Sequence, residues 1–182
     1  MNKRSQVIQE KQTKLRREMF GEDSDDRIWT LDEKGFGSIP RTMSLIMSLF
    51  PELCGKKSNP SQTYVDLWCL SWDGGLVEIR NEKDRAYASG YSSSRRVRSW
   101  RERMSELEKL GFIETRPRGG ETYGYVMLVN PYLVIKKLID EKAVSDAWKG
   151  AFLGRMNEIG VSFPEPPENK KKSASKRKRR VI

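Results

Sequence analysis

The stretch between Gly90 and Gly111 most constrains how this chain can fold. Its apolar residues recur every three or four positions, the spacing of one helix face, at Val97, Trp100, Met104 and Leu107. After Gly111, apolar and polar residues alternate in the segments FIETR and YGYVMLV, which the loop PRGGET connects. Alternation on both sides of a Gly-Gly turn predicts a β-hairpin, so we expect a helix over 93–110 followed directly by a hairpin.

The residues before Gly90 predict two further helices and a strand. Asn59 and Pro60 are suited to the N-cap and first position of a helix that continues to Trp72. The alternating segment 76–80 predicts a short strand. Asn81 is expected to cap a short helix that ends at Gly90, and Ser92 or Ser93 is expected to cap the next one. The spacing of Trp68, Trp72 and Trp100 beside other apolar residues favours core positions over base-stacking platforms.

Outside this region the sequence predicts more helix and two polar tails. Helical spacing of apolar residues over 39–50 predicts a helix, and the composition of 2–20 indicates a frayed or binding-induced helix. A long helical stretch is expected from Pro131 to about 160. The predicted divisions are a basic arm and acidic turn (1–37), a central domain (38–136), a C-terminal helix (137–162) and a disordered basic tail (163–182).

The positive charge is concentrated at the two ends of the chain. The formal net charge is +10. Residues 1–20 hold six Lys/Arg and two Glu, residues 165–182 hold eight Lys/Arg and two Glu, and the middle is neutral overall. Basic arms flanking a neutral body favour a polyanionic partner, although such tails also serve solubility alone. The cluster 170–180 is similar to a nuclear-localisation signal and also fits an electrostatic DNA clamp.

Several functional classes are disfavoured by composition. The chain has two cysteines and no histidine, so a four-ligand zinc site within one chain and His-based catalytic triads are excluded. The acidic residues at 22, 23, 25 and 26 are conceivable as a Mg²⁺ site, but they lack a partner motif. We therefore expect no enzyme, no metal, no cofactor and no small-molecule ligand. Without a 20-residue apolar span or signal peptide, the protein is expected to be cytoplasmic and nucleoid-associated.

The segment 86–128 resembles the winged helix-turn-helix superfamily. The matching features are an alanine, a glycine turn, a Ser/Arg-rich helix start and a Leu-x-x-Leu-Gly-Phe-Ile ending: Ala86, Gly90, Ser92 to Arg96, Leu107, Leu110, Gly111, Phe112 and Ile113. The resemblance implies an α+β, mainly helical fold, here with an extra N-terminal helix, a long C-terminal helix and basic tails. It also implies double-stranded DNA as the partner, as in bacterial, plasmid or phage regulators and replication proteins.

Candidate contact residues follow from the helical register. The face opposite the apolar stripe carries Arg95, Arg98, Ser99 and Glu102, and arginine there is suited to reading guanine. Expected phosphate contacts come from the helix start and its flanks: Ser93, Ser94, Arg96, Arg101 and Arg103. Arg116 and Arg118 in the hairpin are candidates for minor-groove contact. The alternative is that all of these arginines belong to solvated surfaces.

The expected function is sequence-specific DNA binding by a transcription regulator. Replication initiation or partition of a plasmid or phage is one alternative, and a winged-helix adaptor that binds proteins is another. A second apolar stripe in the C-terminal helix leaves two possibilities open, packing onto the domain or the seam of a homodimer. Its residues are Trp148, Phe152, Met156 and Ile159.

Overall fold

The computed structural model of the protein describes residues 3–28, 37–72 and 75–164. The chain forms two units, Met1–Phe36 and Gly37–Ile182. The basic tail expected to be disordered falls, from residue 165 onward, outside the described residues. No helix in the described ranges is both long enough and apolar enough to cross a membrane.

The first unit consists of helix α1 (Lys3–Phe20) and the 3-10 helix η1 (Glu22–Arg27). The chain changes direction at Gly21, whose φ of 90° lies in the region that favours glycine. Arg16 and Arg17 then reach Asp25, at N–O distances of 2.7 Å and 2.5 Å. Hydrogen bonds from these guanidiniums lower the pKa of Asp25 to about 2. The α1–η1 contact is therefore fully present above the usual carboxylate pKa and weakens as the pH falls toward 2.

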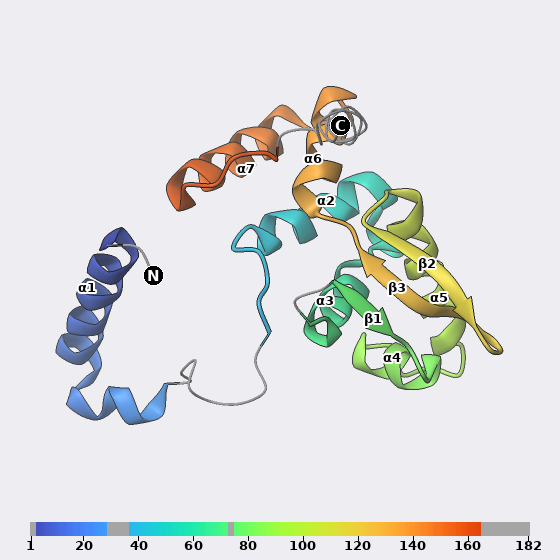
Figure 1. The fold of residues 1–182 in the computed structure, drawn as a ribbon, viewed down its shortest axis with the longest axis horizontal. Helices are drawn as coiled ribbons and strands as arrows, with labels where there is room; N and C mark the ends of the chain where they lie inside the picture. The colour runs from blue at the N-terminus through green and yellow to red at the C-terminus, as the bar shows by residue number, and fades with distance from the viewer. Residues whose placement is uncertain (1–2, 29–36, 73–74, 165–182) are drawn as a thin grey trace, which may run out of the picture. The chain divides into compact units, whose positions relative to one another are not determined.

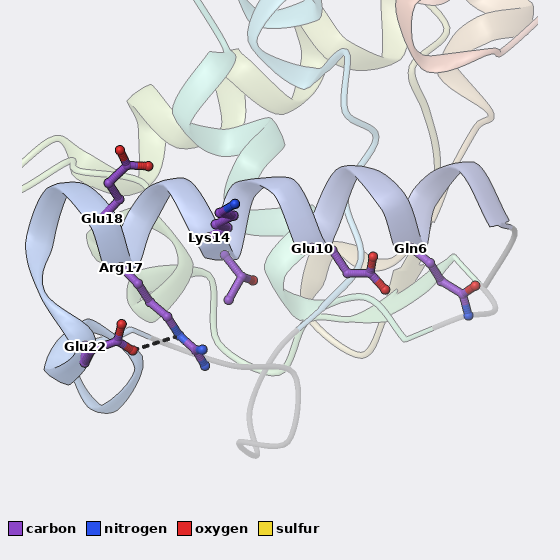
Figure 2. Close-up of a pocket in the computed structure, with 7 residues that line it drawn as sticks. Gln6, Glu10, Lys14, Arg17, Glu18 and Glu22 are labelled. Atoms are coloured by element: carbon purple, nitrogen blue, oxygen red, sulfur yellow. Dashed lines mark ion pairs between the residues drawn. The ribbon is translucent and has the colours of Figure 1, made fainter.

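A shallow groove follows one side of α1 (Figure 2). Its walls carry charges of both signs, from Glu10, Lys14, Arg17, Glu18 and Glu22. Arg17 and Glu22 form an ion pair at 3.7 Å. Apolar side chains elsewhere on α1 are exposed, among them Ile8, Leu15 and Met19. A helix is therefore present over most of the segment 2–20 where one was expected.

The second unit is a mainly helical α+β fold with a three-stranded antiparallel sheet (Figure 1). Its elements in chain order are α2 (Met43–Cys54), η2 (Lys56–Ser58), α3 (Ser61–Leu70), β1 (Leu76–Glu78), α4 (Glu82–Ala88), α5 (Arg96–Lys109), β2 (Ile113–Arg118), β3 (Glu121–Leu128), α6 (Pro131–Asp140) and α7 (Asp146–Ile159). The strand order is β1-β3-β2, so the first strand pairs with the last. The expected α+β, mainly helical class is confirmed.

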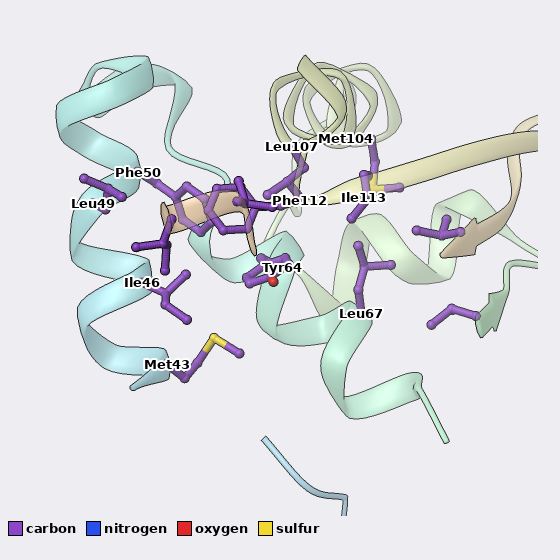
Figure 3. Packing of buried hydrophobic residues seen from close by; sticks show 14 of the residues in the cluster. Met43, Ile46, Leu49, Phe50, Tyr64, Leu67, Met104, Leu107, Phe112 and Ile113 are labelled. Atoms are coloured by element: carbon purple, nitrogen blue, oxygen red, sulfur yellow. The ribbon is translucent and has the colours of Figure 1, made fainter. Parts of the chain in front are cut away.

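Three aromatic rings join the helices to the sheet (Figure 3). Phe50 of α2, Tyr64 of α3 and Phe112 before β2 form a closed triangle of edge-on contacts, with centroids 5.0 to 5.5 Å apart. All three side chains are fully buried. Edge-to-face pairs of this kind add about 0.5–1.5 kcal/mol each to the free energy of area burial.

The apolar stripe of α5 packs onto this core as predicted. Trp100, Met104 and Leu107 are fully buried, and the Trp100 ring meets Tyr123 of β3 edge-on at 5.7 Å. The prediction for Trp72 was wrong, since 88% of this residue is exposed. Helix α3 ends at Leu70, so Trp72 no longer shares its buried face.

The helix starts differ from prediction in one important place. Asn81 caps α4, since its Oδ1 accepts a hydrogen bond from the Lys83 N–H at 3.0 Å. Helix α5, however, begins at Arg96, three residues later than expected. Ser93 instead closes a turn, because its carbonyl accepts from the Arg96 N–H at 3.0 Å. The serines before α5 therefore lie in a turn, and Arg95 occupies the N-cap position.

The predicted long C-terminal helix is two helices. Helix α6 ends where Lys142 adopts a φ of 55° and the Ala143 N–H bonds the Leu138 carbonyl at 2.9 Å. Ser145 then caps α7. The stripe of α7 is used within the chain: Trp148, Phe152 and Met156 are buried, and the Trp148 indole N–H donates to the Leu45 carbonyl of α2 at 2.8 Å. These three side chains are thereby unavailable as a dimer seam.

A bulge at Pro117 shapes the β2–β3 hairpin. The register shifts between Arg116 and Arg118, so the backbone of β2 comes close to Gly124 of β3. A Cβ at Gly124 would lie 2.1 Å from the Arg118 Cβ and 2.6 Å from its backbone nitrogen. Glycine is therefore required at position 124 by space.

We predict that Gly124→Ala destabilises the second unit by about 1–3 kcal/mol or more, the usual cost of overpacking, because backbone atoms must move to admit the methyl group. Urea unfolding of the full chain measures the effect. Gly120→Ala in the same hairpin is the matched control, since its Cβ would meet nothing within 4 Å. Equal stability of the two variants would contradict the close approach.

Candidate nucleic-acid interface

The candidate nucleic-acid interface comprises α4, α5, the turn between them and the β2–β3 hairpin. The turn starts at Gly90, with a φ of 84°, and the Tyr91 N–H bonds the Ala86 carbonyl at 2.9 Å. Ser93 and Ser94 are exposed in the turn. The hairpin runs back alongside α5 (Figure 1), and the Tyr123 hydroxyl donates to the Arg101 carbonyl at 3.3 Å.

The two arginines expected to reach bases are exposed at the start of α5. Arg95 is exposed at the N-cap, and 77% of the Arg98 side chain is accessible. Arg96 and Ser99 are half-buried beside them. The sequence-predicted face is therefore polar and accessible over the first turn of α5, next to the exposed serines.

Arg98 is paired with an acid on its own helix. Its Nε donates to Oε1 of Glu102 at 3.1 Å, and 52% of the Glu102 side chain is accessible. Exposed ion pairs at this spacing typically stabilise a helix by about 0.3–0.5 kcal/mol. The pair is therefore weak enough for Arg98 to exchange it for another acceptor.

Arg101, an expected phosphate contact, is engaged within the protein. Its Nε binds the carboxylate of Glu82 at 2.5 Å, and Glu82 is only 2% exposed. The other Glu82 oxygen accepts from the Tyr123 N–H at 3.4 Å, and Glu121 lies 3.9 Å from Arg101 Nη2. A buried carboxylate needs a cation and hydrogen-bond donors, so this arginine links α5 to α4 and to the hairpin.

Arg103 is turned inward, whereas 45% of the Arg101 side chain stays accessible. Only 15% of the Arg103 side chain is accessible, and its Nη2 donates to the carbonyl of Lys57 in η2. Its Nη1 lies 3.8 Å from Glu102. The structure thus separates Arg103 from the exposed group formed by Arg95 and Arg98.

The two hairpin arginines differ in their surroundings. Arg118 Nη1 lies 2.7 Å from Glu78 of β1, and its guanidinium stands over the Tyr125 ring at 5.7 Å. Arg116 is exposed and donates to the neighbouring Thr115 carbonyl at 2.6 Å. Arg116 is therefore the better placed of the two for an external anion.

Sequence reasoning missed two exposed side chains on α4. Glu82 and Ala86 face the core, which leaves Lys83 and Tyr87, one turn apart, on an adjoining face. Tyr87 is 72% exposed. The spacing of Glu82 and Ala86, four residues apart on one buried face, could have predicted which face of α4 is exposed. The pattern is hard to recognise because glutamate is seldom buried.

Support for α4 comes from an ion pair with α3. Arg85 Nη1 lies 3.2 Å from Asp66, whose side chain is 11% exposed. Burial raises the pKa of Asp66, and the charge of Arg85 opposes this shift.

The part of the chain that the structure describes holds no group of three or more Cys, Asp or Glu side chains arranged for a metal ion.

We predict that Glu82→Ala lowers the free energy of unfolding by about 1–3 kcal/mol, because it strands the Tyr123 N–H and removes the partner of Arg101. Glu114→Ala, at an exposed position of β2, is the control and is expected to stay within about 0.5 kcal/mol of the parent. Chemical denaturation reports both values. A Glu82 variant as stable as the control would show that the buried carboxylate is dispensable.

Comparison with known proteins yields no match for this chain. No protein-family model matches it, and neither does a curated protein or a solved structure.

Proposed function

We propose that this protein binds double-stranded DNA sequence-specifically through a winged helix-turn-helix, with α5 in the major groove. The element order α3, β1, α4, α5, β2, β3 and the sheet order β1-β3-β2 support this arrangement. One observation carries the proposal. Helix α5 buries Trp100 and Leu107 on one side and presents Arg95 and Arg98 to solvent on the other.

The proposed contacts divide by their chemistry. Arg95 and Arg98 address base edges, because the guanidinium fork matches guanine O6 and N7. The exposed serines of the turn and Lys83 and Tyr87 of α4 contact phosphates, as the first helix of such motifs crosses the backbone. Arg116 lies over the minor groove. Arg101 and Arg103 position α5 rather than touch the DNA.

Transcription regulation is the proposed process, with plasmid or phage replication or partition as the alternative. All of these processes would use the same DNA-binding surface. The position of the bound site, at a promoter or at an origin or partition locus, therefore decides between them. A homodimer that reads two half-sites is compatible with this proposal. Its seam would need residues other than the buried stripe of α7.

A protein-binding adaptor is the second candidate, because the outer face of the sheet carries exposed apolar side chains between charged ones. Leu76 of β1 lies opposite Met127 of β3, and they are 57% and 43% exposed. Tyr125 on the same face is 39% exposed. Exposed apolar patches often mark partner sites. Absence of salt-dependent binding to duplex DNA would favour this candidate.

We predict that Arg95→Ala and Arg98→Ala each weaken binding to the preferred duplex by about 1–3 kcal/mol and relax its sequence preference. Lys137→Ala on α6 is the control, because Lys137 is equally exposed, at 73%, and also pairs with a glutamate four residues later. Selection from a random duplex pool followed by titration measures both effects. If the double variant Arg95→Ala/Arg98→Ala selects the same sequence with the same affinity, α5 does not read the bases.

We further predict that the C-terminal tail sets affinity without setting preference. The test replaces residues 165–182, with their eight Lys/Arg, by an uncharged linker of equal length. This variant should bind the specific duplex and the scrambled duplex more weakly than the parent, by similar factors. The salt dependence should become shallower by about 0.9 for each phosphate that the tail no longer neutralises. An unchanged salt slope would assign the tail to another partner, and loss of preference would assign it to groove recognition.

A further inference from the structure

Residues 96–103 of α5 include a single acidic residue, Glu102, among four arginines. Its carboxylate lies between two guanidiniums, at 3.1 Å from Arg98 Nε and 3.8 Å from Arg103 Nη1. Half of its side chain is accessible on the same face as Arg98. If this face meets DNA, Glu102 meets it as well.

Stability gives little reason for an acid at this position. An exposed i, i+4 pair contributes little, and the order with the cation first is the weaker of the two orders. Glu102 also lies in the middle of α5, where it gains nothing from the helix dipole. Arg103 is already held by the carbonyl of Lys57.

Facing the major groove, a carboxylate is favoured most by cytosine. It is repelled by phosphates and by the N7 acceptor beside the adenine amino group, but it accepts a hydrogen bond from the N4 amino group of cytosine, which has no acceptor beside it on the same base. Arg98, one helical turn earlier on the same face, donates to guanine. The pair therefore offers the complementary chemistry for a G·C base pair.

We propose, resting on the DNA-binding function above, that Glu102 determines specificity by selecting a G·C pair. On unrelated sequence the carboxylate keeps Arg98 bound to itself and repels the backbone, so nonspecific binding is weakened. At the preferred site Arg98 exchanges Glu102 for guanine, and Glu102 accepts from a cytosine amino group. Discrimination thus arises from one acid and one arginine acting together.

The test is Glu102→Gln in the full chain, because the amide keeps the shape and removes the charge. We expect tighter binding to a scrambled duplex, a specific-to-scrambled affinity ratio lower by about 5-fold or more, and a shift of the selected base from cytosine toward adenine, whose N6 and N7 an amide binds together. Glu141→Gln is the matched control, since Glu141 is 55% exposed and pairs with Lys137 at the same i, i+4 spacing. It should leave the ratio unchanged.

The outcomes separate this inference from the proposed function. If the parent protein shows no sequence preference, the DNA-binding proposal fails. If the parent selects a sequence but Glu102→Gln keeps the parental ratio and cytosine, Glu102 has no part in specificity. If the variant binds both duplexes more tightly by the same factor, Glu102 acts only by repelling the DNA charge, and this result would also overturn the inference. Thermal melting confirms that both variants are folded.

Discussion

The arrangement of the interface depends on one buried carboxylate. Glu82 is removed from water at the first turn of α4, and a carboxylate there is tolerated only with a cation and hydrogen-bond donors. Arg101 of α5 and the Tyr123 N–H of β3 supply them. Because the carboxylate and its partners come from three elements, α4, α5 and the hairpin hold one another in place. The exposed side chains of α5 are presented on that frame.

The arginines of α5 belong to two groups that composition does not distinguish. Arg101 binds the buried Glu82 although 45% of its side chain is accessible, and Arg103 binds the Lys57 carbonyl. Arg95 is exposed, and Arg98 pairs only with an exposed acid of its own helix. Helical register predicts which side an arginine lies on, but whether a flanking guanidinium turns inward depends on acceptors from distant parts of the chain. Lys57 lies 46 residues from Arg103 and supplies one such acceptor.

Most errors in predicting the elements arose at their ends. Asn81 and Asn130 cap helices, as expected for asparagine at a helix start. The side-chain oxygen of each accepts a hydrogen bond from the N–H two residues later. The serines before α5 are also good capping residues but form a turn, and Trp72 lies beyond the end of α3 with 88% of its surface exposed. The break between α6 and α7 needs a positive φ at a lysine, which local sequence does not favour.

The sequence by itself determined the class of fold, the buried stripe of α5, the hairpin and the accessible Arg95 and Arg98. These follow from local periodicity and turn residues, which act over one or two helical turns. Only the tertiary structure decided that Glu82 is buried, that Gly124 faces the Arg118 backbone and that the α7 stripe packs on α2. Each of these depends on atoms brought together from separate elements of the chain, and a local pattern carries no information on such contacts.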